Sequence, residues 1–282
     1  MTPKEFNNII DKLPTTPRLP ILFVGHGNPM NAIEDNIYSR AWKQLEFQLP
    51  KPKAILSISA HWLSSDTSVH ISKKPRTIHD FWGFPDELYK IEYPCPGAPD
   101  FAMATQEIVN KTTVLKDVEW GLDHGTWSVL HHMYPNAEIP VYQLSINLTK
   151  TTLWHYELAK ELAPLREKGV LIMGSGNIVH NLSRLAWEPN ATPYDWAEEF
   201  DQQSKKLIIE ENHRSLIEYE KLGPAAKLAI PTPDHYWPLI YVLGLQKKNE
   251  SVSFPIEGIA LGSVGMRTVL IGESLDSARR NG

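Results

Sequence analysis

The chain has 282 residues, of which 42% are hydrophobic and 22% are charged, as in ordinary globular proteins. Its formal net charge of −5 argues against nucleic-acid binding, and no apolar run approaches the roughly 20 residues that span a bilayer. The charged, amphipathic start over residues 1–13 is unlike a signal peptide. The single cysteine, Cys95, excludes a disulfide framework within the chain, so we expect a cytoplasmic protein.

Short apolar runs, several of them bounded by Gly or Pro, predict the strands of this chain. In chain order they lie near residues 20–25, 53–60, 67–72, 140–147, 169–174, 227–231, 252–256, 259–263 and 267–271. Helical patterns lie between the strands, at residues 39–49, 99–112, 149–169 and 194–222. This alternation predicts an α/β fold with helices packed on the faces of a sheet.

The chain shows no internal repeat, low-complexity segment or Gly/Ser linker. Residues 79–99 are rich in proline but also hold five aromatic residues, so we interpret them as an ordered excursion rather than a linker. The sequence therefore predicts one domain over residues 1–282.

Four histidines each follow the carboxyl end of a predicted strand. His26 and His61 come after the runs ILFVG and ILSISA, whereas His180 and His235 come after GVLIMGSGNIV and AKLAIPTPD. In open α/β sheets this edge is where ligands and chemistry collect, and histidine is a common ligand of zinc, iron and copper. The pattern favours a metal site, although a histidine at a strand end can also be a simple capping residue.

His124 has a different setting, in the segment EWGLDHGTWSVL. Acidic neighbours can orient its ring, while Trp120 and Trp127 can form walls beside it. The following Gly125 also permits a turn into a helix, so a purely structural role stays open at this stage. We interpret the six remaining histidines as structural or solvated, namely His70, His79, His131, His132, His155 and His213.

Six motifs occur in order between residues 20 and 270, namely GHGNPM, SAHW, HDFWGFPDELYKIEYPCPG, DHGTWSVL, GSGNIVHNL and PTPDHYWPL. Together they resemble the DOPA 4,5-dioxygenase family, a branch of the LigB-like (class III) extradiol ring-cleaving dioxygenases. The resemblance implies a LigB-like α/β domain with a central mixed sheet. It also implies a metal-dependent enzyme that cleaves a catechol such as DOPA at the 4,5-bond. By the same resemblance, both atoms of O2 would enter a muconic semialdehyde product.

The resemblance also assigns roles to the histidines. It implies that His26, His61 and His235 bind one divalent non-haem metal, and that His124 faces the substrate. His180 would act as the base, a role suited to a pKa near 7, or as a fourth ligand in a resting zinc site. Because His235 stands where related class III enzymes have a glutamate, the all-nitrogen set also suits zinc. We therefore expect Fe(II) in the active enzyme and Zn(II) in purified protein.

Two other functions fit a histidine-rich site, a zinc hydrolase and a metal-binding homologue without turnover. The hydrolase would need a carboxylate as general base, and Asp123 and Asp234 are the near candidates. For a substrate carboxylate, the candidate partners are Arg76, Arg184 and Arg267. The residues that can stack on a substrate ring, or else belong to the core, are Trp62, Phe81, Trp82, Phe84, Tyr236 and Trp237.

Overall fold

The structure is a computed structural model that describes residues 8–188 and 191–273. The first residues of the amphipathic amino-terminal segment and both ends of the predicted domain lie outside this range. Among the residues described, no helix combines the length and the apolar character needed to cross a membrane.

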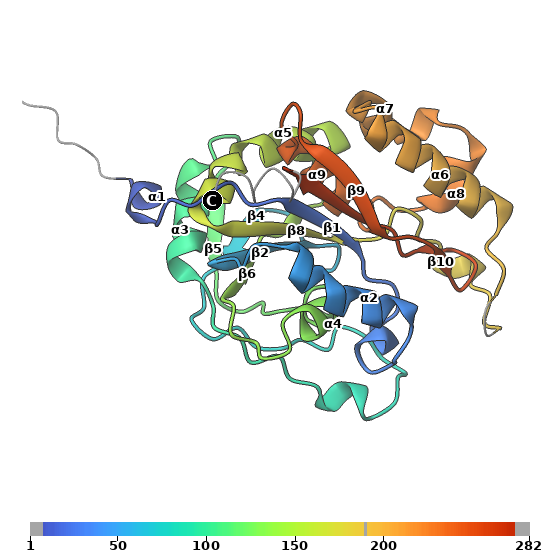
Figure 1. Ribbon diagram of the computed structural model, residues 1–282, viewed down its shortest axis with the longest axis horizontal. Helices are drawn as coiled ribbons and strands as arrows, with labels where there is room; N and C mark the ends of the chain where they lie inside the picture. Colours follow the sequence, from blue (N-terminus) through green and yellow to red (C-terminus); the bar gives the residue numbers. More distant parts are fainter. Residues whose placement is uncertain (1–7, 189–190, 274–282) are drawn as a thin grey trace, which may run out of the picture.

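The centre of the fold is a six-stranded sheet with the strand order β6-β2-β8-β1-β12-β9 (Figure 1). The first four of these strands run parallel to one another, whereas β12 runs antiparallel to both β1 and β9. The predicted α/β fold with a mixed sheet is therefore confirmed. The strands are β1 (Ile21–Gly25), β2 (Ala54–Ser59), β6 (Val141–Gln143), β8 (Val170–Gly176), β9 (Ser251–Ile256) and β12 (Thr268–Gly272).

Three short two-stranded pairs accompany this sheet. They are β3 (Leu63–Ser64) with β7 (Ile146–Asn147), β4 (Thr67–His70) with β5 (Val114–Asp117), and β10 (Ile259–Ala260) with β11 (Val264–Gly265). The predicted run at residues 140–147 thus supplies β6 to the main sheet and β7 to a smaller one.

Helices cover both faces of the main sheet. They are α1 (Ile9–Lys12), α2 (Ile37–Leu45), α3 (Pro99–Ile108), α4 (His124–Met133), α5 (Thr152–Glu161), α6 (Asp195–Ile209), α7 (His213–Ile217), α8 (Pro224–Ala229) and α9 (Trp237–Leu245). Short 3-10 turns are η1 (Pro29–Ala32), η2 (Glu46–Gln48), η3 (Leu88–Lys90), η4 (Ala163–Lys168), η5 (Leu182–Arg184) and η6 (Tyr219–Lys221).

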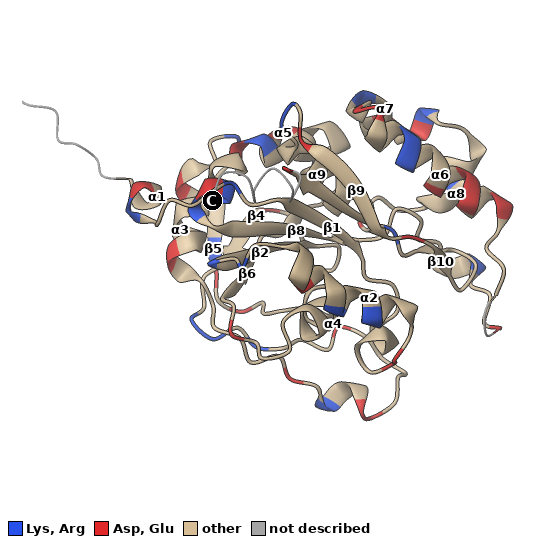
Figure 2. Ribbon diagram, viewed as in Figure 1, with Lys and Arg blue, Asp and Glu red and all other residues tan. Residues whose placement is uncertain are grey.

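Alternate residues of β1 belong to two separate hydrophobic cores. Ile21 and Phe23 pack with residues of α3, α5, α6, α8 and α9, whereas Leu22 and Val24 pack with residues of α2 and α4. Because a parallel strand in this position is buried on both faces, its sequence is a continuous apolar run, which is why periodicity identifies it easily. Charged side chains of both signs lie on the outer helices and loops, and β1, β2 and β8 carry none (Figure 2).

The strand predicted at residues 227–231 is wrong. These residues form the end of α8 and the turn after it, and Ala225, Ala226 and Ala229 are buried against α6 and the core. Pro224 occupies the first turn, a position where proline favours a helix. A short apolar run looks the same in a buried helix and in a buried strand, so the sequence did not separate the two.

The helical pattern at residues 194–222 is real but interrupted. Helix α6 ends at Ile209, and Glu211 then adopts a positive φ of 52°. Asn212 caps the shorter α7 by accepting a hydrogen bond from the backbone N–H of Ser215. The helix therefore ends where periodicity alone predicted that it would continue.

Arg267, which directly precedes β12, forms a buried ion pair with α6. Its guanidinium binds both carboxylate oxygens of Asp201, and it also binds Glu257. Arg267 and Asp201 are buried. We expect Asp201→Ala to lower the free energy of unfolding by about 3–5 kcal/mol, because it leaves the buried guanidinium short of a counter-charge. Urea denaturation measures this loss, and Asp195→Ala at the exposed start of α6 should change stability little.

Candidate active site

Three of the strand-end histidines reach the same edge of the sheet. His26 directly follows β1, His61 follows β2, and His180 follows β8. These three strands are parallel neighbours, so their carboxyl ends lie together.

His235 arrives at this edge by another route. It lies in the loop between α8 and α9 and therefore does not follow a strand. Its backbone carbonyl accepts a hydrogen bond from the N–H of Asn177, which ties this loop to the end of β8. The sequence-based reason for choosing His235 was therefore wrong, although the structure brings the residue to the cluster.

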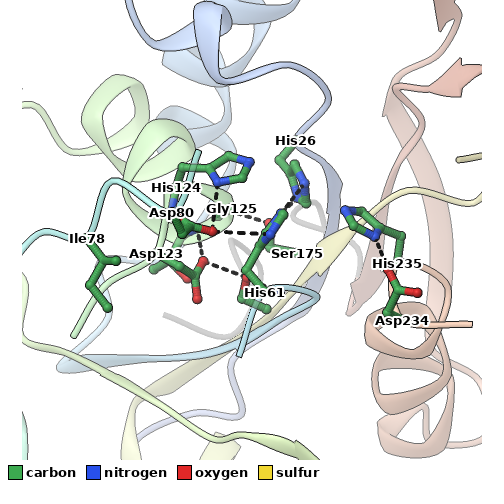
Figure 3. A network of polar contacts seen from close by, with 12 residues as sticks. His26, His61, Ile78, Asp80, Asp123, His124, Gly125, Ser175, Asp234 and His235 are labelled. Carbon is green, nitrogen blue, oxygen red and sulfur yellow. Dashed lines mark hydrogen bonds and ion pairs between the residues drawn. The ribbon is translucent and has the colours of Figure 1, made fainter. Parts of the chain in front are cut away.

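The imidazole rings form a compact cluster (Figure 3). The ring centroids of His26 and His61 are 5.0 Å apart, and that of His235 lies 5.4 Å and 5.0 Å from them. On the other side, the His124 ring lies 4.0 Å from His61. Ligand atoms of His26, His61 and His124 all lie within 4.8 Å of one another. All five candidate histidines line one pocket.

The Nε2 atoms of His26 and His61 are 3.1 Å apart. Two nitrogens bound to one ion at about 2.0–2.1 Å, with a ligand–metal–ligand angle between 90° and the tetrahedral value, lie about 2.9–3.4 Å from each other. The separation of this pair therefore fits a shared ion.

Hydrogen bonds select the tautomer of His26. The hydroxyl of Ser175 donates to the backbone carbonyl of Gly125 at 2.5 Å, and it lies 3.0 Å from Nδ1 of His26. Since a hydroxyl has one proton to donate, Nδ1 of His26 must be the donor in this pair. That leaves the lone pair on Nε2 free, which is the form that binds a metal.

Carboxylates hold three other rings in the same way. Asp80 Oδ2 accepts a hydrogen bond from Nδ1 of His124 at 3.0 Å and lies 3.2 Å from Nδ1 of His61. Asp234 accepts a hydrogen bond from Nδ1 of His235. Each arrangement turns Nε2 toward the cluster. Sequence analysis missed Asp80, although it lies inside the motif that begins HDFWGFP.

His26 and His61 are neutral at pH 7. Burial, followed by the neighbouring histidines, lowers the pKa of both His26 and His61 well below the usual value. Neutral imidazole is the form that coordinates a metal, so these two rings do not have to lose a proton before an ion binds. For Asp80, burial acts to raise the pKa, but the hydrogen bonds and charge of His124 outweigh it and lower the pKa.

His180 differs from the other four histidines. Its ring stacks on that of His235, with centroids 3.5 Å apart and an angle of 8° between the planes. Within the described residues no hydrogen bond reaches its ring, whereas its backbone N–H donates to the carbonyl of Ala229. Burial and the nearby His235 lower the pKa of His180 to about 2, far from the value near 7 that suits a base.

Gly125 allows the cluster to close. A Cβ at this position would lie 2.7 Å from Oγ of Ser59, 2.9 Å from Cδ2 of His61 and 3.2 Å from Nδ1 of His26. Any larger residue would therefore displace the histidines. Gly125, which the sequence suggested as a turn residue, is therefore needed for the close approach of α4 to His26 and His61.

Apolar and aromatic residues enclose the space above the histidines, with a cavity volume of about 310 Å³. This is the size of a small-molecule site. Phe81, Trp82 and Phe84 line it, as proposed from the sequence, and Trp187, Leu182 and Leu185 are additional. The other proposed wall residues are buried away from this pocket, namely Trp62, Tyr236 and Trp237.

None of the three arginines considered for the substrate lines the pocket. Arg76 donates to the carbonyl of Trp120, Arg267 is held by Asp201 and Glu257, and Arg184 is exposed. The carboxylates considered as hydrolytic bases are also engaged. Asp123 caps α4 and accepts from Ser59, and Asp234 holds His235.

The histidines interpreted as structural lie outside this pocket. All but His131 form hydrogen bonds elsewhere in the fold; they are His70, His79, His132, His155 and His213.

Comparison with known proteins identifies the family of the chain. Residues 21–265 match the family described as the catalytic LigB subunit of aromatic ring-opening dioxygenase. The chain belongs to this family. A relative from Escherichia coli (strain K12) named 4,5-DOPA dioxygenase extradiol is 44% identical over 266 residues, covering 93% of this chain and 98% of the relative. One of the same name from Beta vulgaris is 39% identical and covers 80% of this chain and 87% of its own.

A solved structure of similar fold is described as an uncharacterized protein from Escherichia coli K12. It has a TM-score of 0.79 and 41% identity, and the match covers 90% of this chain and all of that one. The predicted LigB-like fold and the resemblance to the extradiol family are therefore confirmed. The chain is a LigB-family dioxygenase, an enzyme that acts on an aromatic substrate and O2.

Within this LigB-family site, the carboxylate of Asp80 faces two of the histidines, His61 and His124. We expect Asp80→Asn to weaken Zn(II) or Co(II) binding by about 10–100-fold, the usual effect of losing such a partner. The amide keeps the size of the side chain, but it no longer offers a charged acceptor to both rings. Competition with a chromophoric chelator measures the affinity, and Asp86→Asn in the same segment serves as the control.

Proposed function

We propose that this protein is an extradiol dioxygenase that opens the ring of a catechol such as DOPA at the 4,5-bond. Both atoms of O2 would enter the product, a muconic semialdehyde. The observation that carries the proposal is the cluster of histidines with free Nε2 atoms at the floor of an apolar pocket. The names of the relatives support the choice of substrate. Residues from positions 26 to 264 line one pocket, which supports a single catalytic domain over residues 1–282.

The site fits one divalent, non-haem metal ion. His26, His61 and His235 would hold it through Nε2, and His180 is close enough to His235 to join them as a fourth ligand in a resting zinc state. The all-nitrogen set suits both iron and zinc, so Fe(II) is proposed for activity and Zn(II) for purified protein. When bound, such an ion lowers the pKa of the catechol hydroxyls, and iron also exchanges electrons with O2.

The protein itself would handle the protons of the catechol. The ring of His180 is neutral and free of hydrogen bonds from described residues, so it can accept a proton from a catechol hydroxyl and return it later. An anionic catechol oxygen beside His180 would raise its pKa, because a nearby negative charge favours the protonated ring. His180 would therefore have a low pKa only while the substrate is absent, and it could act as the base once the catechol is bound.

His124 would position the substrate. Its Nδ1 donates to Asp80 and its backbone N–H donates to the other oxygen of the same carboxylate, which holds the ring at the start of α4. Nε2 then faces the pocket, where it can accept a hydrogen bond from a substrate hydroxyl. Phe81 contacts the His124 ring edge-on, with centroids 5.5 Å apart, and excludes water from this side.

The test is anaerobic reconstitution with Fe(II), addition of a catechol and then exposure to O2. We expect O2 uptake together with a yellow ring-opened product, and neither from protein loaded with Zn(II) alone. Consumption of O2 without ring opening, or cleavage of esters or amides by the zinc form, would contradict the proposal.

A further inference from the structure

Two tryptophans at the mouth of the pocket are largely open to solvent. Trp82 is 87% exposed and Trp187 is 73% exposed, although both line the pocket. They come from separate parts of the chain, since Trp82 lies in the 79–99 segment and Trp187 follows η5. Tryptophan is highly buried on average in folded proteins, so an exposed pair at the entrance of a pocket indicates contact with a ligand.

The same entrance lacks positive side chains. Among the described residues that line the pocket, none is Lys or Arg. The described lining residues include one carboxylate, Asp80, whose Oδ2 contacts His61 and His124. Leu182 and Leu185 line the pocket on either side of Arg184, whose own side chain does not.

The entrance of the pocket should bind ring substituents with an affinity that depends on their charge. A substituent that ends in a carboxylate would leave water for aromatic and apolar groups without gaining a cation, which is unfavourable. A neutral substituent can pack on the indole faces, and an ammonium group is attracted to them by their negative electrostatic potential.

We propose that Trp82 and Trp187 hold the ring substituent of the catechol and favour a neutral or cationic substituent over an anionic one. This rests on the proposed function, which places the diol at the histidines and so directs the substituent to the mouth. An amino-acid catechol such as DOPA would present its ammonium group to the indoles and keep its carboxylate in solvent. A catecholamine without the carboxylate is therefore the better substrate class.

Three catechols of similar size test the charge preference. Dopamine has a cationic tail, 4-ethylcatechol a neutral one, and 3,4-dihydroxyphenylacetate an anionic one. We expect kcat/KM of the Fe(II) enzyme to be at least about tenfold higher for the first two than for the third, equivalent to about 1.4 kcal/mol. Calorimetric titration of the Zn(II) enzyme, which does not turn over, should give Kd values in the same order.

Trp82→Ala and Trp187→Ala test the residues. Each should lower kcat/KM for dopamine and 4-ethylcatechol by about three- to tenfold, with a smaller effect on the anionic catechol. Trp82→Phe should retain part of the preference because it keeps an aromatic face. Phe47→Ala is the matched control, since Phe47 is 77% exposed in η2 and lies outside the pocket.

Equal kcat/KM values for the three catechols, or tryptophan variants that behave like Phe47→Ala, would overturn the proposal. So would a change of oligomeric state in sedimentation velocity that is confined to the tryptophan variants, because the exposed indoles would then belong to a contact between copies. If none of the catechols is opened but the zinc form retains the order of affinities, the proposed function is wrong. The preference of the pocket entrance for neutral or cationic substituents is then still supported.

Discussion

His26→Ala, His61→Ala and His235→Ala are each expected to abolish retention of a divalent metal, whereas His124→Ala should keep it. The first three rings converge with centroids 5.0–5.4 Å apart, and hydrogen bonds to Ser175 and Asp234 keep the proton of His26 and His235 on Nδ1. Removing one of three ligands leaves an ion with too few nitrogens to survive dialysis. Elemental analysis of dialysed protein gives the metal content per chain.

The His124→Ala variant distinguishes between two possible sets of ligands, one with His235 and one with His124. His26, His61 and His124 also lie close enough to share an ion, so geometry alone permits that set. We place His124 outside the ligand set because the motif resemblance puts it on the substrate side; its hydrogen bond to Asp80 leaves Nε2 free, as in His61 and His235, and does not separate the two sets. Metal loss from His124→Ala with retention in His235→Ala would reverse the assignment, and full metal content in His26→Ala or His61→Ala would contradict the site itself. His131→Ala, on α4 and outside the pocket, is the control.

The parallel part of the sheet could be predicted because its strands carry their own signal. β1, β2 and β8 are buried on both faces, so each is a mainly apolar run that ends shortly before a histidine, with serines only in β2 and in the last residues of β8. Once three such strands are parallel neighbours, His26, His61 and His180 must arrive at one edge. For these three residues the sequence is therefore enough to predict that they lie close together.

His235 shows where such a prediction fails. Its apolar run at residues 227–231 belongs to a helix, and the loop reaches the cluster through tertiary contacts such as the hydrogen bond from Asn177. Nothing in a local pattern encodes a contact between residues 58 positions apart. The apolar run led to His235 for a wrong reason, whereas the motif resemblance pointed to it independently.

Asp80 and Trp187 show a second limit. Asp80 acts on His61 and His124, which are 19 and 44 positions away, and its acidity looks like that of any loop residue. Trp187 is a single aromatic residue in an irregular segment. Arg267 was a plausible partner for a substrate, yet it is buried with Asp201. Residue type suggests what a side chain can bind, but only the fold determines what lies beside it.

His180→Ala is expected to keep most of its Fe(II) and to lose about 10²–10⁴-fold in turnover, the usual contribution of a positioned acid–base group. A permanent fourth histidine ligand would leave a bound ion too few open positions for the catechol and O2, so His180 would not be expected to stay bound during the reaction. His180 suits a movable role, because its ring stacks on His235 while the other four rings are each held through Nδ1. Elemental analysis and single-turnover rates measure the two quantities separately.

His180→Phe separates chemistry from packing in this prediction. Phenylalanine keeps an aromatic ring against His235 but has no nitrogen to take a proton. If His180 acts as the base, His180→Phe should be as slow as His180→Ala while retaining its iron. If the residue only supports His235, the phenylalanine variant should turn over nearly normally and the alanine variant should lose metal. Loss of iron from both variants would instead identify His180 as a permanent ligand, and normal turnover in both would remove it from the mechanism.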